Sequence, residues 1–165
     1  MVFFMIKKIN FYHVAVADLL NSTAPLISTL FKADLKTLAV CNDTDLLVKA
    51  DAKLWTFSSN VFCPHGLETD PNPELQPILF CDLNKLNKNL NLATCVCLIS
   101  NNFIEDFIKI QDIITNNIPE IEVLICIFTI PEQETRNCIT LFNKLDISDK
   151  KYFIDLSGKW AEYNK

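Results

Sequence analysis

The sequence predicts an α/β fold in which one sheet carries helices on both of its faces. Six apolar runs that suit buried strands alternate along the chain with segments of helical periodicity, which is the pattern of a mostly parallel sheet. The chain has 165 residues and is 50% hydrophobic, so it is long enough for one domain with a substantial core. We therefore expect a single α/β domain over residues 1–165.

The predicted strands are short runs rich in β-branched and other apolar residues. Several lack strict alternation, as expected where both faces of a sheet are covered. They occupy residues 9–16, 35–41, 60–63, 77–82, 94–100 and 122–130. The proline-rich stretch 66–77 and the stretch 84–91, rich in Asn and Lys, are predicted to be loops.

The first predicted helix spans residues 44–55 and is entered from Asn42 and Asp43. Asp43 and Asp45 also follow a strand at its carboxyl end, where doubly wound folds often bind ligands. Capping of the helix explains Asp43 without a ligand, and we favour that interpretation.

Two later helices are predicted from periodicity. One begins at Asn102, which forms a capping-box pattern with Glu105. Its apolar side chains recur at helical spacing: Phe103, Phe107, Ile110 and Ile114. The other begins at Pro131, a residue suited to a first helical position. It carries a buried stripe of Cys138, Phe142 and Leu145.

Charge and hydropathy restrict the classes of partner. The formal net charge of -5 argues against direct binding of nucleic acid as the main task, so any contact with DNA is expected to be indirect. The first eight residues place their lysines after a very short apolar run, the reverse of a signal peptide, and no later segment is apolar for long enough to span a bilayer. We expect a cytoplasmic protein that does not bind membranes.

Glycine is too scarce for a phosphate-binding loop. Such loops need glycines where backbone N–H groups approach the phosphates, and the chain has only Gly66 and Gly158. The sequence therefore predicts no nucleotide-binding loop and no cofactor.

Catalysis by cysteine and histidine is an alternative function that the sequence supports less well. Cys63 and His65 could serve as nucleophile and base in a small cytoplasmic hydrolase or transferase, and Cys95 and Cys97 share one strand face. However, His13 is the one further histidine, and the seven cysteines lie mostly in apolar runs. We expect core packing for the cysteines, no metal site and no catalytic residues.

A polar ridge is predicted along the last helix. Arg136, Thr140 and Lys144 recur every four residues and so share one face. A solvated face explains the ridge, but a local basic patch on an acidic protein would also attract an acidic peptide. Three further residues can extend the patch: Asn143, Lys150 and Lys151.

The segment 54–67 places Trp55 beside a loop and Phe62 in an apolar run. Large aromatic side chains of this kind often anchor protein interfaces. Burial in the core is the competing explanation for both residues. A generic α/β adaptor that binds another protein through Trp55 is therefore a further possibility.

Several short elements occur in an order and spacing typical of one family. They are Phe11-Tyr12, Cys41-Asn42-Asp43, Leu54-Trp55, Phe62-Cys63-Pro64-His65-Gly66-Leu67, Tyr152-Phe153 and Gly158-Lys159-Trp160. On these residues the chain resembles the chi subunit of bacterial DNA polymerase III over nearly its full length.

The resemblance implies a non-enzymatic adaptor in the clamp-loader assembly of the replicative polymerase, with a Rossmann-like fold and no cofactor. Chi subunits hold the acidic, aromatic-ended C-terminal tail of the single-stranded-DNA-binding protein. Through another surface they bind the psi subunit, so psi or an equivalent clamp-loader component is an expected partner.

The resemblance also implies where these two partners bind. Arg136 and Lys144 match the outer basic positions of the family's tail site, whereas Thr140 stands at its middle basic position and Asn143 lies near a family tyrosine. On the psi-facing surface, Trp55 and Phe62 match family aromatics. Pro64 and His65, which lie beside them in the sequence, are further candidates for this surface.

Overall fold

The computed structural model describes residues 5–58, 60, 62–156 and 159–163. Its strands are β1 Lys8–His13, β2 Thr37–Cys41, β3 His65–Leu67, β4 Ile78–Asp82, β5 Cys95–Ser100, β6 Val123–Phe128, β7 Asp149–Leu156 and β8 Lys159–Glu162. Its helices are α1 Leu19–Lys32, α2 Thr44–Thr56, α3 Phe103–Asn116 and α4 Thr135–Lys144. Short 3-10 segments are η1 Val16–Asp18, η2 Pro73–Leu75 and η3 Glu132–Glu134.

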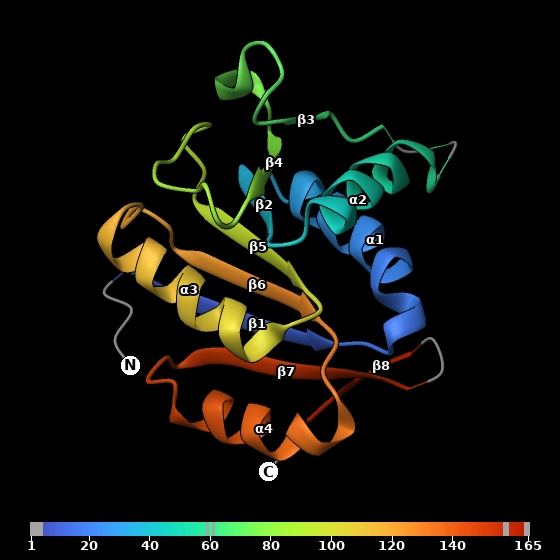
Figure 1. Cartoon of the computed structure of the whole chain (residues 1–165), viewed down its shortest axis with the longest axis vertical. Helices are drawn as coiled ribbons and strands as arrows, with labels where there is room; N and C mark the ends of the chain where they lie inside the picture. The colour runs from blue at the N-terminus through green and yellow to red at the C-terminus, as the bar shows by residue number, and fades with distance from the viewer. Residues whose placement is uncertain (1–4, 59, 61, 157–158, 164–165) are drawn as a thin grey trace.

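The eight strands form one twisted sheet in the order β3-β4-β2-β5-β6-β1-β7-β8 (Figure 1). Every neighbouring pair is parallel except β7 and β8, which are antiparallel. β1 is an interior strand and pairs with both β6 and β7. The predicted α/β fold with a mostly parallel sheet is confirmed.

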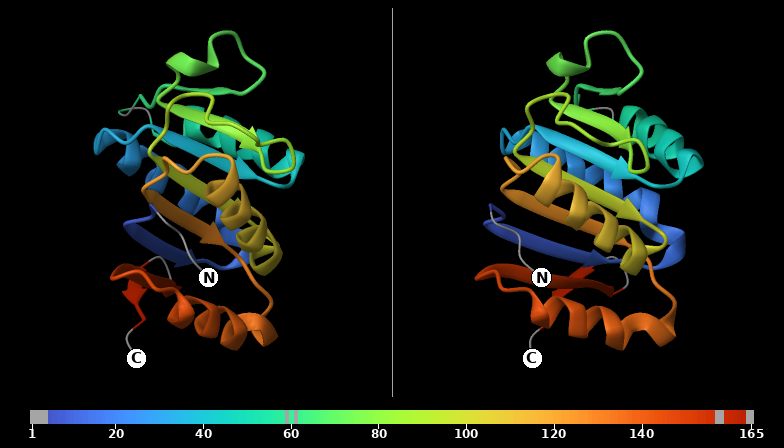
Figure 2. Two further views of the ribbon diagram at one scale, coloured as in Figure 1. Left: turned by 90° about the vertical axis from the view of Figure 1, so that its left-hand side faces the viewer. Right: turned by 60° about the vertical axis from the view of Figure 1, so that its left-hand side comes forward.

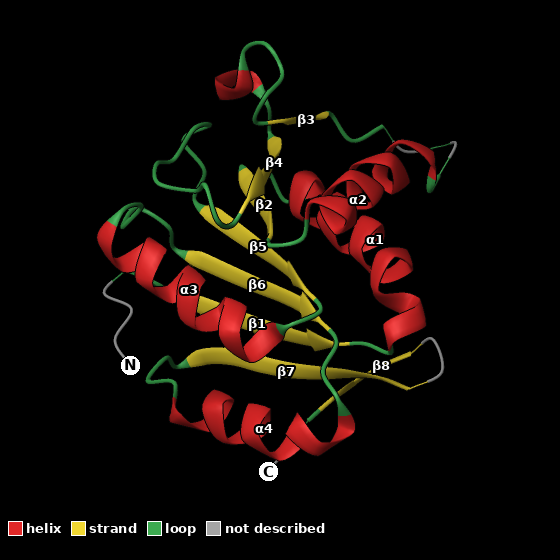
Figure 3. Cartoon of the chain, viewed as in Figure 1, coloured by secondary structure: helices red, strands yellow, loops and turns green. Residues whose placement is uncertain are grey.

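Helices cover both faces of the sheet (Figures 2 and 3). α1 and α2 pack on one face through side chains such as Ile27 and Leu47. α3 and α4 pack on the other through Phe107 and Phe142. Neighbouring residues of β1 alternate between these two cores, so Phe11 points to α3 and α4 while Tyr12 points to the α1 side.

The predicted strand at residues 60–63 is wrong where the structure describes it. Residues 60, 62 and 63 are irregular, Val61 lies outside the described residues, and β3 begins after Pro64. Because proline has no N–H for a ladder, pairing with β4 starts at His65. Phe62 is consequently exposed and not part of the sheet.

Three predictions about strand and helix ends also need correction. The first strand ends at His13, and Val16 belongs to η1. The Asn102 side chain does not cap the backbone of α3 but donates to Glu105 Oε2 at 2.8 Å. The η3 segment, with Pro131 as its N-cap, precedes α4.

α1 and the strands β7 and β8 were not predicted. α1 contains Pro25, an unfavourable residue inside a helix, yet it buries Leu19, Ala24 and Ile27 against the sheet. Tertiary packing therefore overrides the local signal. β7 is stabilised by its pairing with β1, which lies near the other end of the sequence.

A buried carboxyl group joins the loops at the carboxyl ends of β2 and β5. Asp106 is fully buried in α3. It accepts hydrogen bonds from Asn42 Nδ2 and from Ser100 Oγ, each at 2.6 Å. Burial raises the pKa of Asp106, and these hydrogen bonds oppose the rise.

The raised pKa of Asp106 predicts a pH-dependent loss of stability. Above about pH 4 the unfolded carboxyl has lost its proton while the native one still holds it, so stability falls as pH rises through the native pKa. The Asp106→Asn variant should lack this fall. Urea midpoints of both proteins, measured from acid to neutral pH, test this, and parallel curves would contradict it.

Candidate functional site

The exposed side of α4 borders an open hollow of about 520 Å³. We call this hollow the α4 groove. Its lining residues are Glu132, Thr135, Arg136, Ile139, Thr140 and Tyr163.

The wall of the α4 groove is apolar. Ile139 and Tyr163 are partly buried hydrophobic residues that pack on the core of the α4 side. Tyr163 comes from the segment after β8, where its N–H donates to the Tyr152 carbonyl oxygen at 2.6 Å and its ring lies 5.8 Å from the Tyr152 ring. The charged residues Arg136 and Glu132 therefore line the same hollow as this apolar wall.

The polar residues of the ridge differ in what they can offer a ligand. Arg136, Thr140 and Lys144 are all exposed on α4. The Thr140 hydroxyl already donates to the Arg136 carbonyl oxygen at 2.9 Å. Lys144 lies beyond the groove lining, whereas Glu132 is one of the lining residues. Arg136 is thus the cationic residue that lines the groove.

Lys150 has a structural role at the end of α4. Its ammonium donates to the carbonyl oxygens of Phe142 at 3.1 Å, Asn143 at 3.2 Å and Leu145 at 2.6 Å. These are the carbonyls that a helix end leaves without intrahelical partners. Lys150 is therefore engaged in capping the helix.

Lys151 lies away from the ridge. Successive residues of a strand point to opposite faces, and Tyr152 packs on Phe142 of α4 at 5.4 Å between ring centroids. Lys151 therefore points to the α1 side, where its register partner is Asn10. The structure brings Arg136 and Thr140 together in the groove but places Lys151 across the sheet.

A second exposed region lies at the end of α2. Trp55 is 55% exposed and Phe62 is 69% exposed, and their ring centroids are 6.2 Å apart. Val48 is also exposed and lies seven residues before Trp55, on the same side of the helix. We call Val48, Trp55 and Phe62 the Trp55 patch. Exposure of both aromatics runs against their interpretation as core residues.

His65 packs against the inner side of Trp55 in the Trp55 patch. Its side chain is fully buried, and its ring centroid lies 4.3 Å from that of Trp55. Nδ1 lies 2.7 Å from the Cys63 carbonyl oxygen, and Nε2 lies 3.3 Å from Asp51 Oδ1. His65 therefore positions Trp55 and cannot itself contact a partner, whereas Pro64 is half-buried beside it.

The geometry of Cys63 and His65 does not suit nucleophilic catalysis. His65 contacts the Cys63 carbonyl oxygen, so the short contact does not involve the thiol. The Cys63 side chain is 3% exposed, and burial raises the pKa of its thiol to about 11. A reactive thiol needs exposure and a lowered pKa.

The other candidate groups have structural explanations. All seven cysteines are free and buried, as predicted for core packing. Asp43 Oδ1 accepts from the N–H groups of Asp45 at 2.9 Å and Leu46 at 3.2 Å, which confirms it as the cap of α2. Across the described residues, no cluster of three or more His, Cys, Asp or Glu is placed to hold a metal. No helix in the described part of the chain is long and apolar enough to cross a membrane.

Sequence reasoning did not identify Ile139, Tyr163 or Glu132 as groove residues. Ile139 lies three residues after Arg136, so helical spacing could have found it. Tyr163 reaches the groove only because β8 folds back on β7, and no local pattern reveals that contact.

Comparison with known proteins identifies one family. A family model described as "DNA polymerase III chi subunit, HolC" matches residues 6–136. A curated protein of Rickettsia prowazekii (strain Madrid E), named "Probable DNA polymerase III subunit chi", is 27% identical over 155 residues, which cover 84% of this chain and 92% of the relative. The family match includes the Trp55 patch and ends at Arg136, near the start of α4.

Proposed function

The chain belongs to the DNA polymerase III chi subunit family and is an accessory subunit of that polymerase, and on this premise we propose that it binds the acidic C-terminal tail of the single-stranded-DNA-binding protein in the α4 groove. The observation that carries the proposal is the meeting of Arg136 with the apolar wall of Ile139 and Tyr163. We propose no catalytic role for the chain, which would link the clamp loader to single-stranded DNA through protein contacts.

The chemistry of the α4 groove matches an acidic peptide that ends in an aromatic residue. Arg136 can form paired charge-assisted hydrogen bonds with a carboxylate. The apolar wall can take the terminal aromatic ring. Lys144 lies eight residues further along the helix, about 12 Å away, which is the length of about four extended peptide residues. Arg136 and Lys144 can thus contact separate acidic groups of one tail.

Two features of the α4 groove limit its affinity for an acidic tail. Thr140 adds no charge at the middle position, and Glu132 adds a negative charge to the lining. We therefore expect a transient complex with a dissociation constant on the order of micromolar, weakened by salt.

The Trp55 patch is the proposed site for a second partner, the psi subunit or an equivalent clamp-loader component. Exposed Trp and Phe side chains in contact are the usual energetic centre of an interface. The patch lies on α2 and the loop before β3, while α4 covers the opposite face of the sheet at the far end of the strand order. Two partners can therefore bind at once.

Fluorescence titration of a labelled tail peptide tests the tail site. The peptide is the last ten or so residues of the host single-stranded-DNA-binding protein. Saturable binding is expected at low salt. The Arg136→Ala, Lys144→Ala double variant should bind about tenfold more weakly, because it loses two charge-assisted contacts. Glu132→Gln should bind about twofold more tightly, because it removes a repelling charge.

Matched controls separate the groove from general charge effects. Lys151→Gln removes one positive charge on the other face of the sheet and should leave the affinity unchanged. Lys150→Met should lower stability through the lost helix cap while leaving tail affinity nearly intact. Absence of saturable binding, or equal affinity of the double variant and the wild type, would overturn the proposed tail site.

A further inference from the structure

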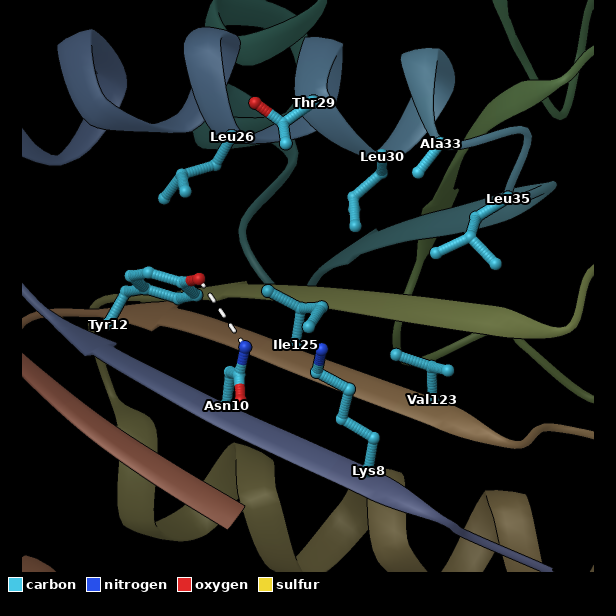
Figure 4. A pocket seen from close by; sticks show the side chains of 10 residues that line it. All are labelled: Lys8, Asn10, Tyr12, Leu26, Thr29, Leu30, Ala33, Leu35, Val123 and Ile125. Carbon is cyan, nitrogen blue, oxygen red and sulfur yellow. Dashed lines mark hydrogen bonds between the residues drawn. The ribbon is translucent and has the colours of Figure 1, made fainter. Parts of the chain in front are cut away.

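A partly open cavity lies between α1 and the sheet, on the face opposite the α4 groove. Its volume is about 200 Å³. Strands β1 and β6 form its floor and α1 forms its roof (Figure 4). Nothing in the proposed binding of a tail or of a clamp-loader component uses it.

The floor carries a row of polar side chains on one strand. Lys8, Asn10 and Tyr12 occupy alternate positions of β1 and therefore share the face toward α1. Figure 4 shows the Lys8 ammonium and the Asn10 amide nitrogen both pointing from β1 toward α1. An apolar cavity thus contains a polar edge along one side.

The Asn10 side chain is buried without full hydrogen bonding. The residue is 7% exposed, and within the described residues its Oδ1 atom has no hydrogen-bond partner. Its Nδ2 donates to the Tyr12 hydroxyl oxygen at a long 3.4 Å. A buried amide in this condition destabilises the fold, and the second N–H of Nδ2 can still donate to a ligand.

The Lys8 ammonium is also available. Lys8 is half-buried at the cavity, and within the described part of the chain it has no hydrogen-bond or ion-pair partner. Asp149 is its register neighbour on β7, yet no salt bridge joins the two side chains. A free cation beside an amide N–H favours an anion as the ligand.

The rest of the lining is apolar. Leu26 and Leu30 of α1 face Val123 and Ile125 of β6 across the cavity. The hydroxyl of Thr29 donates to the Pro25 carbonyl oxygen at 3.0 Å within α1, so it is already engaged. A cavity of about 150 Å³ with such walls accepts benzene. The space therefore suits one aromatic ring with a small substituent.

We propose that this cavity binds a small aromatic monocarboxylate, with its ring between α1 and β6 and its carboxylate held by Lys8 and Asn10. Asn10 Nδ2 carries two N–H groups, so it can donate one to the Tyr12 hydroxyl oxygen and the other to the carboxylate. The Lys8 ammonium supplies the charge-assisted contact to the same carboxylate.

NMR titration of the ¹⁵N-labelled chain with phenylacetate tests the proposal, with phenylacetamide as the neutral partner of the same shape. Phenylacetate should shift the amide signals of Leu26, Leu30 and Ile125 saturably, with a dissociation constant on the order of a millimolar or lower. Phenylacetamide should bind about tenfold more weakly because it cannot pair with the ammonium.

Variants identify the residues that hold the carboxylate. Lys8→Gln should weaken phenylacetate binding about tenfold and abolish the preference over phenylacetamide, and Asn10→Leu should abolish binding. The control Lys32→Gln removes an exposed charge of α1 outside the cavity lining and should change nothing.

Three results would overturn the proposal: no saturable shifts with the fold intact, equal binding of the acid and the amide, or unchanged binding by Lys8→Gln. A fourth is tighter binding of a capped dipeptide ending in phenylalanine at the same signals. That result would assign the cavity to a peptide C-terminus and not to a free small molecule.

Discussion

Replacement of Phe11 by alanine is expected to lower the free energy of unfolding by about 3–5 kcal/mol, the range for large aromatic truncations in a packed core. Phe11 is fully buried on the interior strand β1. Its ring lies within 5.0–5.7 Å, between centroids, of five aromatic rings: Phe103, Phe107, Phe128, Phe142 and Tyr152. The truncation would leave a cavity where α3, α4 and the sheet meet.

Urea denaturation followed by circular dichroism measures this loss of stability. Phe62→Ala is the matched control, because the same residue type is exposed there and its truncation should change stability by about 0.5 kcal/mol or less. A loss below about 1 kcal/mol for Phe11→Ala would contradict the central position assigned to this ring.

Loss of the Trp55 patch is expected to have the largest effect on association with the clamp loader. The Trp55→Ala, Phe62→Ala double variant removes two exposed aromatic side chains that lie together. Interface anchors of this kind cost about 2 kcal/mol or more each, so the affinity should fall more than about 100-fold. Stability should change little, because both side chains are exposed.

Surface plasmon resonance with the purified host clamp loader measures this affinity. Val16→Ala is the control, because Val16 is also exposed but lies in η1, away from the patch. Equal binding by the double variant and the wild type would show that the Trp55 patch does not bind the clamp loader. The tail site in the α4 groove is tested separately by the peptide titration.

Local signals in the sequence were sufficient for much of the fold. Asp43 before an apolar periodic run predicts the start of α2, and the helical spacing of Phe103 and Phe107 predicts α3. Continuous apolar runs predict β2, β5 and β6 because both faces of these strands are covered. In each case the information lies within one short segment.

The missed elements depend on contacts between distant segments. α1 forms despite Pro25 because its apolar side packs on the sheet, and β7 forms by pairing with β1. For the candidate sites, the spacing of Arg136 and Thr140 predicts a shared face. It cannot reveal that Tyr163 completes the α4 groove or that Lys150 caps α4, since both depend on how the C-terminal strands fold back.

We propose that this one accessory subunit joins two partners through separate surfaces. The most direct measurement is quantitative affinity purification from the host of three tagged proteins: the wild type, the Arg136→Ala, Lys144→Ala variant and the Trp55→Ala, Phe62→Ala variant. We predict that the first variant loses the single-stranded-DNA-binding protein and keeps the clamp-loader subunits, while the second shows the reverse. Loss of both partners from either variant, or of neither partner from both, would contradict the claim.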